Sequence, residues 1–454
     1  FSILEGRDNI GGTWDLFKYP GIRSDSDMHT LGFRFKPWIH DKSIADGPSI
    51  MEYLYETIDD YELKDNILLN HKVCSANWNS EKSLWELEIK ENDQLVNMTC
   101  NFLFLCGGYY SYTKPHMPDF KNQENFEGQI IHPQFWDESL EYEDKKIAVI
   151  GSGATAITIV PAIAEKAEHV VMIQRSPTYV VSGPSEDSIN KSLRKILPVK
   201  LTYFLIRWKN ILYQSFTFFM ARKYPERTKH KILELAKDEL GSDYDIDKHF
   251  TPSYKPWDQR ICLVPDSDLF EAINNKKASV ITDTIDEFQS DGILLSSGEK
   301  VEADIIITAT GIELNSLNDI NVSIDNEKVN PNERLTYKGM MLSGVPNFAI
   351  SFGYVNASWT LRADLTCEYV CRLLNLMDKK GVACCEPIDD ETAYGDDELI
   401  DFSSGYVRRG LNQMPKQGNK APWKNYQNYL KDIFAVRLFS IKDSNLNFYN
   451  SKNQ

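Results

Sequence analysis

The segment between residues 146 and 176 constrains the fold of this chain more than any other part of its sequence. It begins with an apolar run at 147–150, passes through a glycine-rich turn into an apolar segment, and ends in a second apolar run at 170–173. A strand, a glycine turn, a helix and a second strand within about 30 residues make up the βαβ unit of a dinucleotide-binding fold. The order therefore predicts an α/β protein with a parallel sheet.

The glycine-rich turn of this unit matches the pattern G-x-G-x-x-A. Small residues at these positions let the backbone come close to a pyrophosphate, which the free N–H groups and the positive dipole end of the helix then hold. An ordinary strand-to-helix turn is the alternative, and the complete unit around the turn disfavours it. The residues predicted to bind this nucleotide are Gly151, Ser152, Gly153, Ala154, Thr155, Ala156 and Ile157.

The residues after the second strand indicate which nucleotide binds here. An acidic residue at this position accepts a hydrogen bond from the ribose 2′-hydroxyl of NADH, whereas an arginine pairs with the 2′-phosphate of NADPH. The chain has Arg175 here, with the hydroxyl of Ser176 beside it. We therefore expect this unit to bind NADPH through Arg175 and Ser176.

The start of the chain is typical of the middle of a second nucleotide unit. A short apolar run at 1–4, predicted to be a buried strand, ends in Glu5 and leads to a glycine turn at 9–14. Glu5 occupies the position that Arg175 has in the other unit, and its carboxylate fits the unphosphorylated ribose of a nucleotide such as FAD. The phosphate loop of such a unit lies about 20 residues before its acid. We therefore expect roughly 25 to 30 residues, with the first strand and the phosphate loop, upstream of Phe1.

Two Rossmann-like dinucleotide-binding domains are expected. Residues 1–137 are predicted to form the FAD-binding domain, without its N-terminal strand and phosphate loop. Residues 138–300 are predicted to form the NADPH-binding domain, with a helical insertion at about 185–250, where strand-like alternation is lacking. Residues 301–454 are predicted to return to the FAD-binding domain, which is therefore discontinuous, and to end in a C-terminal region.

Composition argues against several other classes of protein. The formal net charge of −16 repels the phosphate backbone of nucleic acids, so we expect no nucleic-acid partner. The eight cysteines form no CxxC pair and no repeated metal-ligand spacing. This usage predicts reduced thiols in a cytoplasmic protein, and no metal site.

The segment at 201–224 is the part of the chain most similar to a membrane element. It is rich in aromatic residues but contains Arg207, Lys209, Arg222 and Lys223, and no run of about 18 apolar residues occurs in the chain. A buried or interdomain helix is the favoured interpretation. A helix on a membrane surface is the alternative, so peripheral membrane contact stays open.

A motif shortly before the βαβ unit carries a family resemblance. Residues 126–137 read FEGQIIHPQFWD and match the pattern F-x-G-x-x-x-H-x-x-x-W-[PD] at every specified position. The segment resembles the fingerprint of flavin-containing Baeyer-Villiger monooxygenases. The resemblance implies that it joins the FAD and NADPH domains and couples their motion, so His132 is not predicted to be a catalytic base. The alternative is that His132 and Trp136 only pack a linker.

The resemblance extends over nearly the whole chain and is to the ethionamide-activating branch of that family. The segments that carry it lie at 11–14, 19–25, 255–260, 308–311 and 353–361. One difference concerns Gln259, since many relatives have a lysine there that helps to bind the 2′-phosphate. Arg175 must then carry more of the preference for NADPH.

The resemblance also implies roles for individual residues. Arg260 would stabilise negative charge during oxygen transfer, and Asp25, near the flavin, would orient it through a charge-assisted pair. A surface arginine in a solvated loop is the alternative for Arg260. Arg23 and Ser24 would contact the nicotinamide nucleotide. The residues expected to contact FAD are Glu5, Gly11, Gly12, Thr13, Trp14, Asp25 and, through its backbone, Val73.

The function implied by the resemblance is an NADPH- and FAD-dependent monooxygenase that uses O2 through a C4a-peroxyflavin. Its substrates would be ketones, which yield esters or lactones, or sulfur compounds such as thioamides and sulfides. The alternatives are a flavin monooxygenase that oxidises nitrogen or sulfur without Baeyer-Villiger activity, and an inactive or nucleotide-binding fragment without the FAD phosphate loop. A flavin-dependent disulfide reductase is disfavoured because the flavin-loop region has no cysteine pair. The physiological substrate and the oligomeric state stay open.

Overall fold

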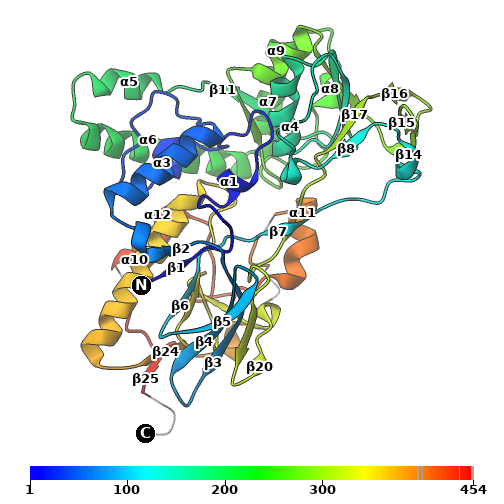
Figure 1. Cartoon of the computed structure of the whole chain (residues 1–454). Helices are drawn as coiled ribbons and strands as arrows, with labels where there is room; N and C mark the ends of the chain where they lie inside the picture. The colour runs from blue at the N-terminus through cyan, green and yellow to red at the C-terminus, as the bar shows by residue number, and fades with distance from the viewer. Residues whose placement is uncertain (396–397, 401, 439, 451–454) are drawn as a thin grey trace.

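The chain forms two bodies, which Figure 1 shows one above the other. One is built on a parallel sheet with helices, and the other mainly on antiparallel strands. The chain enters the parallel-sheet body after β7 (Tyr110–Pro115) and leaves it before β18 (Ile312–Leu314). β7 and β18 pair antiparallel, so the two crossings run side by side. The computed structural model describes residues 1–395, 398–400, 402–438 and 440–450.

The parallel-sheet body contains the βαβ unit predicted from the sequence. β9 (Lys146–Ile150) leads through the glycine turn into α4 (Ala154–Ala164) and then into β10 (His169–Gln174), which pairs parallel with β9. The sheet has the order β13-β10-β9-β17-β8, and all its pairs are parallel. The prediction of a parallel α/β sheet is therefore confirmed. The remaining strands are β8 (Gln129–Ile131), β13 (Ala278–Thr282) and β17 (Ile305–Thr308).

The two faces of this sheet are covered differently, because successive side chains of a strand point to opposite faces. Ile147 and Val149 of β9 pack in a cluster with residues of α4 and α9 (Asp268–Asn274). Ala148 and Ile150 pack on the other face against a small antiparallel sheet. That sheet consists of β14 (Ile285–Gln289), β15 (Gly292–Leu295) and β16 (Lys300–Glu302).

β9 also marks the point at which the strand order changes direction. Its neighbours are β10 on one side and β17 on the other. In open α/β sheets, ligands bind in the crevice at the carboxyl ends of the strands around such a point. The turns at this edge hold residues 151–153, 175–176 and 309–311.

The second body is organised around a five-stranded sheet of order β20-β19-β3-β4-β5. β3 (His71–Asn79) and β4 (Leu84–Glu91) form an antiparallel pair, and the buried Trp78 and Trp85 meet across it with ring centroids 5.6 Å apart. Further elements outside the parallel-sheet body are α1 (Thr13–Leu16), α2 (Met28–Leu31), α3 (Gly47–Asp60), α10 (Trp359–Lys380), β1 (Ile3–Leu4), β2 (Ile67–Leu68), β5 (Gln94–Cys100), β6 (Leu103–Leu105), β19 (Asn321–Ile324), β20 (Glu327–Lys328) and β23 (Phe348–Ile350).

The stretch at 185–250 is helical, as predicted. α6 ends before Pro225 because a residue that precedes proline avoids the helical conformation, and Pro225 then begins α7. The helices of this stretch are α5 (Ser188–Arg194), α6 (Val199–Lys223), α7 (Pro225–Leu240) and α8 (Ile246–His249).

Polar contacts hold α6 to the rest of the molecule. Arg207, only 3% exposed, donates from Nη1 to the carbonyl oxygens of His29 and Gly32, each at 2.7 Å. Its Nη2 donates to the carboxylate of Asp364 at 2.8 Å. Removing one partner of a buried ion pair costs about 3–5 kcal/mol. These directional bonds therefore fix which side of α6 faces inward.

Two expectations about burial need correction. The helix at 201–224 is buried on its inner face only, because that face holds the polar anchors, whereas Phe204 and Phe216 on its outer face are 56% and 60% exposed. The strand at 1–4 is not buried either: β1 pairs with β2 at the margin of the second body, and Ile3 is 41% exposed.

The parallel sheet also extends past both domain boundaries expected from the sequence. β8 precedes residue 138 and β17 follows residue 300, yet both strands belong to the sheet of β9. Parallel pairing joins strands that are far apart in the chain, so local patterns do not reveal it. Among the described residues, no helix is both long and apolar enough to cross a bilayer.

Candidate functional site

The turn after β9 is shaped for close approach by a ligand. Gly151 has φ +140°, and a Cβ there would lie 2.3 Å from the carbonyl oxygen of Ala309, so only glycine fits. A Cβ at Gly153 would meet no atom within 4 Å, which leaves the start of α4 open. No side chain caps the first N–H groups of α4. These groups fit a pyrophosphate, in the manner expected for residues 151–157.

Arg175 and Ser176 follow β10 at the same edge, and both are exposed. The hydroxyl of Ser152 donates to the carbonyl oxygen of Ser176 at 3.0 Å and joins the two turns. Within the described residues, the Arg175 side chain has no hydrogen bond or ion pair. Its guanidinium is therefore free to pair with a phosphate beside the start of α4.

The second glycine turn, Gly11–Gly12, lies before α1 in the other body. Both residues have positive φ, +110° and +54°, and a Cβ at Gly11 would lie 2.3 Å from the sulfur of Met51 on α3. Arg7 donates to the carbonyl oxygen of Gly12 at 3.2 Å and pairs with the buried Asp15 at 2.6 Å. The contacts of Arg7 and the close packing of Met51 therefore fix the conformation of this turn.

The other residues expected to contact FAD surround this turn. Burial raises the pKa of Glu5, although its carboxylate accepts a hydrogen bond from the Arg7 N–H at 3.0 Å. Thr13 begins α1, and Trp14 packs beside a buried aromatic cluster. Val73 lies half-buried on β3. The structure thus gathers these residues on the body that also carries β1 and β3.

The segment at 19–25 connects the two nucleotide edges. A Cβ at Gly21 would lie 2.6 Å from the Cβ of Ala162, which shows how closely the segment packs on α4. Ser24 is 2% exposed, and its hydroxyl accepts a hydrogen bond from the Ala45 N–H at 3.1 Å. Arg23 forms a bidentate ion pair with Asp268, the first residue of α9.

Asp25, at the end of this segment, pairs with Arg260. The Oδ2 of Asp25 lies 2.9 Å from Nη2 of Arg260, and the two side chains are 45% and 32% exposed. Asp258 holds the loop of Arg260 in place: its carboxylate accepts from Arg222 of α6 at 2.8 Å, and its carbonyl oxygen accepts from the Ser403 N–H at 2.8 Å. The pair predicted from the sequence is thus present as a contact.

Three tyrosines, Tyr109, Tyr110 and Tyr406, lie close enough to this guanidinium to influence its pKa. Partial burial alone would lower the pKa of Arg260, but the charge of Asp25, with smaller contributions from these tyrosines, raises the pKa overall. Burial raises the pKa of each tyrosine, so all three remain neutral hydroxyls at physiological pH. The result is a permanent positive charge that is paired with a carboxylate and has neutral tyrosines nearby.

One short strand connects Arg260 to the glycine turn. Tyr110 begins β7 near Arg260, and Tyr112 on the same strand has its hydroxyl 2.9 Å from the Cβ position of Gly12. Residues two apart on a strand point to the same face and are separated by about 7 Å. Arg260 and the Gly11–Gly12 turn therefore border a common region.

His132 makes two hydrogen bonds that define its tautomer. Its Nδ1 accepts from the Gln134 N–H at 3.1 Å, so its Nε2 carries the proton and donates to the carbonyl oxygen of Gly311 at 3.2 Å. Burial lowers the pKa of His132 to about 4, which keeps the ring neutral. His132 thus connects the 126–137 segment to the turn after β17, and Trp136 packs beside the core of the parallel sheet.

Sequence reasoning missed several residues of this site. Tyr109 and Tyr110 follow a Gly-Gly stop, but nothing local relates them to Arg260. Tyr406 lies far along the chain, and Asp268 reads from the sequence as an ordinary helix start. These contacts are long-range, and a single sequence carries no signal for them. The roles predicted for Arg23 and Ser24 stay predictions, since both residues are engaged by protein groups.

The comparisons with known proteins agree with this geometry. The family model described as flavin-binding monooxygenase-like matches residues 43–342. The FAD-containing monooxygenase EthA of Mycobacterium tuberculosis (strain ATCC 25618 / H37Rv) is 49% identical over 449 residues, which cover 99% of this chain and 92% of that protein. The probable FAD-binding monooxygenase AlmA of Acinetobacter baylyi (strain ATCC 33305 / BD413 / ADP1) is 47% identical over 451 residues, with 99% and 90% covered.

Solved structures share the fold at low identity. An oxidised steroid monooxygenase bound to NADP aligns with a TM-score of 0.79 and 20% identity, covering 99% of this chain and 94% of that one. Cyclohexanone monooxygenase from Rhodococcus sp. Phi1 bound to NADP+ aligns with a TM-score of 0.76 and 18% identity, covering 98% and 94%.

The chain belongs to the flavin-binding monooxygenase-like family. Its resemblance to the ethionamide-activating branch is confirmed by the near full-length match to EthA. The expected pair of Rossmann-like domains agrees with the matched structures as well.

The neutral His132 predicts a pH dependence of stability. The unfolded chain binds a proton at this residue below pH ~6.5, whereas the folded chain does not until the pH falls to about 4. Stability should therefore fall as the pH drops through this window, since the unfolded state binds more protons there. His132→Asn should flatten this decline in the melting temperature between pH 7 and 4.5. His230→Asn, on the exposed surface of α7, should leave the profile unchanged, and equal profiles for all three proteins would contradict the assignment.

Proposed function

We propose that this chain is an NADPH- and FAD-dependent monooxygenase of the Baeyer-Villiger type. It would insert one oxygen atom into ketones to give esters or lactones, or oxidise sulfur compounds such as thioamides and sulfides. The observation that carries the proposal is the Arg260–Asp25 ion pair at 2.9 Å, on a segment packed between two glycine turns. Membership of the flavin-binding monooxygenase-like family supports it.

The two cofactors have separate sets of residues. The Gly11–Gly12 turn, with Glu5 and Val73 beside it, would hold FAD. The start of α4 would hold the pyrophosphate of NADPH, and Arg175 would pair with its 2′-phosphate. Relatives support both assignments by name, since EthA is FAD-containing and the steroid monooxygenase structure is bound to NADP. FAD, when bound, takes two electrons from NADPH and activates O2.

Arg260 supplies the fixed charge that the reaction needs. Its guanidinium would bind the oxygen of a substrate carbonyl or of another acceptor as negative charge develops there. Asp25 would act as a positioning residue, because its carboxylate pairs with the guanidinium and directs it. The neutral side chains of Tyr109, Tyr110 and Tyr406 near the guanidinium would help to exclude water, which would strengthen each charge interaction.

The choice between ketone and sulfur oxidation rests on the relatives. The resemblance to the ethionamide-activating branch implies sulfur compounds as well as ketones, and the matched structures include a cyclohexanone monooxygenase. A ketone panel and a thioether panel, analysed for products in parallel, would separate Baeyer-Villiger activity from sulfur oxidation alone.

Arg260→Ala should separate cofactor reduction from oxygenation. With the purified chain, anaerobic NADPH should bleach a bound flavin in the wild type and in the variant alike. On admission of O2 and substrate, the variant should form product at least about 100-fold more slowly, because it lacks the group that stabilises developing charge.

The matched control is Arg227→Ala on the exposed surface of α7, which should behave as the wild type. Normal oxygenation by Arg260→Ala would remove Arg260 from its role. A purified chain that binds no flavin would contradict the proposed function itself and favour a nucleotide-binding remnant.

Arg175→Ala should change the preference between nicotinamide nucleotides. Loss of a charge-assisted contact of about 1.5–3 kcal/mol predicts a rise of about 10- to 100-fold in the KM for NADPH, with little change for NADH. Steady-state oxidation of both nucleotides measures this, and Ser176→Ala should have a smaller effect. Equal effects on NADPH and NADH would exclude Arg175 as the 2′-phosphate ligand.

A further inference from the structure

The outer face of helix α6 is unusual for a folded protein. Apolar side chains recur along it at helical spacing, and each is between 41% and 60% exposed. Contiguous exposed apolar surface of this kind marks an interaction site rather than ordinary surface. The outer face of α6 consists of Leu201, Phe204, Leu205, Leu212, Phe216 and Phe219.

The inner face of the same helix carries polar side chains among buried apolar ones such as Ile206 and Ile211. Asn210 and Gln214 donate to the carboxylate of Asp27 at 2.7 and 2.8 Å, and Arg207 binds Asp364 and two backbone carbonyls. A surface helix normally turns its apolar stripe inward and its polar residues outward. The polar bonds on the inner face fix the orientation of α6, and in this orientation the apolar side chains of the outer face remain exposed.

The charge around this face is positive, although the chain as a whole is acidic. Between Ser188 and Tyr224 there are eight lysines and arginines and no aspartate or glutamate, in a chain of net charge −16. Five of these eight cations have acidic partners outside the segment, namely Lys191, Arg194, Arg207, Lys209 and Arg222. Lys195 and Lys200 before the apolar face and Lys223 after it are exposed, and none forms an ion pair within the described residues.

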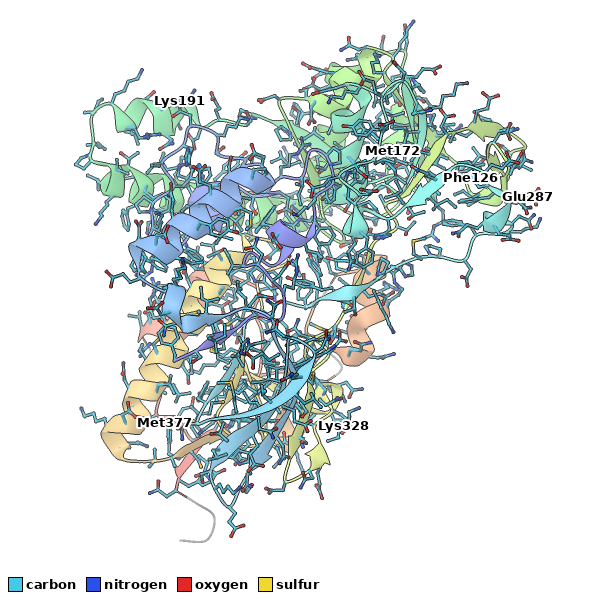
Figure 2. All side chains as sticks on the ribbon, in the orientation of Figure 1. Phe126, Met172, Lys191, Glu287, Lys328 and Met377 are labelled. Atoms are coloured by element: carbon cyan, nitrogen blue, oxygen red, sulfur yellow. The ribbon has the colours of Figure 1, made fainter. Side chains whose placement is uncertain are left out.

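We propose that the outer face of α6 docks on an anionic lipid bilayer. The helix would lie in the plane of the interface, with its aromatic and aliphatic side chains in the boundary between headgroups and acyl chains. Lys195, Lys200 and Lys223 would contact lipid phosphates, each adding about 1 kcal/mol of attraction. Figure 1 shows α5 at one margin of the molecule with α6 beside it, and Figure 2 shows Lys191 of α5 at the same margin.

A second copy of the chain fits this face less well. In a two-fold dimer the same patch meets itself, which would bring the unpaired lysines of one copy against those of the other. Like charges at an interface oppose association. An anionic bilayer instead offers both an apolar interior and negative headgroups.

Sedimentation of the purified full chain with lipid vesicles tests the proposal. Vesicles of phosphatidylcholine with added phosphatidylglycerol should bind the chain, vesicles of phosphatidylcholine alone should bind it several-fold more weakly, and salt should reduce the difference. Phe216→Ser with Phe219→Ser should lower the partition coefficient at least about tenfold. Leu95→Ser, which removes a 73% exposed leucine on β5, is the matched control and should bind as the wild type.

A second variant isolates the charges. Lys195→Glu with Lys200→Glu should weaken binding to the anionic vesicles and leave the weak binding to neutral vesicles unchanged. Melting temperatures and NADPH binding should match the wild type in every variant, since these side chains are exposed. The proposal is overturned if the wild type binds neither vesicle, or if the Phe216→Ser, Phe219→Ser protein binds as well as Leu95→Ser. If the wild type binds neither vesicle and is instead an oligomer that the two serine substitutions dissociate, the outer face of α6 is an interface between copies of the chain and the bilayer proposal is overturned.

Discussion

The ion pair between Arg260 and Asp25 is the contact on which the proposed chemistry depends. It is partly exposed, and such pairs contribute little to stability, so its value lies in geometry. Two connections fix that geometry. The segment at 19–25 is packed on α4 and joined to α9 through Arg23 and Asp268, and the loop of Arg260 is held by α6 through Asp258.

The same region lies where the two bodies of the molecule meet. β7 and β18 pair at the two chain crossings, and β7 carries tyrosines near both Arg260 and the Gly11–Gly12 turn. His132 adds a bond across the crossing, from the fingerprint segment to the carbonyl oxygen of Gly311. A change in the relative position of the two bodies would therefore alter the geometry of the Arg260–Asp25 ion pair. α6 participates too, because Phe218 packs on Trp257 with ring centroids 5.4 Å apart.

Much of the nucleotide edge could be predicted from the sequence, because its determinants are local. Gly151 and Gly153 lie within three residues of each other, and Arg175 follows directly after the next strand. The Asp25–Arg260 contact came from a family resemblance rather than from spacing, since the two residues are far apart in the chain. The tyrosines around Arg260 could not be predicted, because they converge from β7 and from a distant helix.

The orientation of α6 shows a different limit. Its sequence has aromatic residues on most sides, so periodicity alone does not say which side is buried. The answer depends on Asp27 and Asp364, which receive its polar side chains from two other parts of the fold. Likewise, β8 and β17 join the parallel sheet through pairings that no local pattern encodes.

The most direct measurement is the amount of product formed per NADPH oxidised in Asp25→Asn and Asp25→Glu. If Asp25 positions Arg260, the asparagine variant should reduce its flavin at the normal rate but yield about 10- to 100-fold less product per NADPH, with hydrogen peroxide in its place. The glutamate variant should recover part of the loss. Full coupling in Asp25→Asn would contradict the central role of this ion pair.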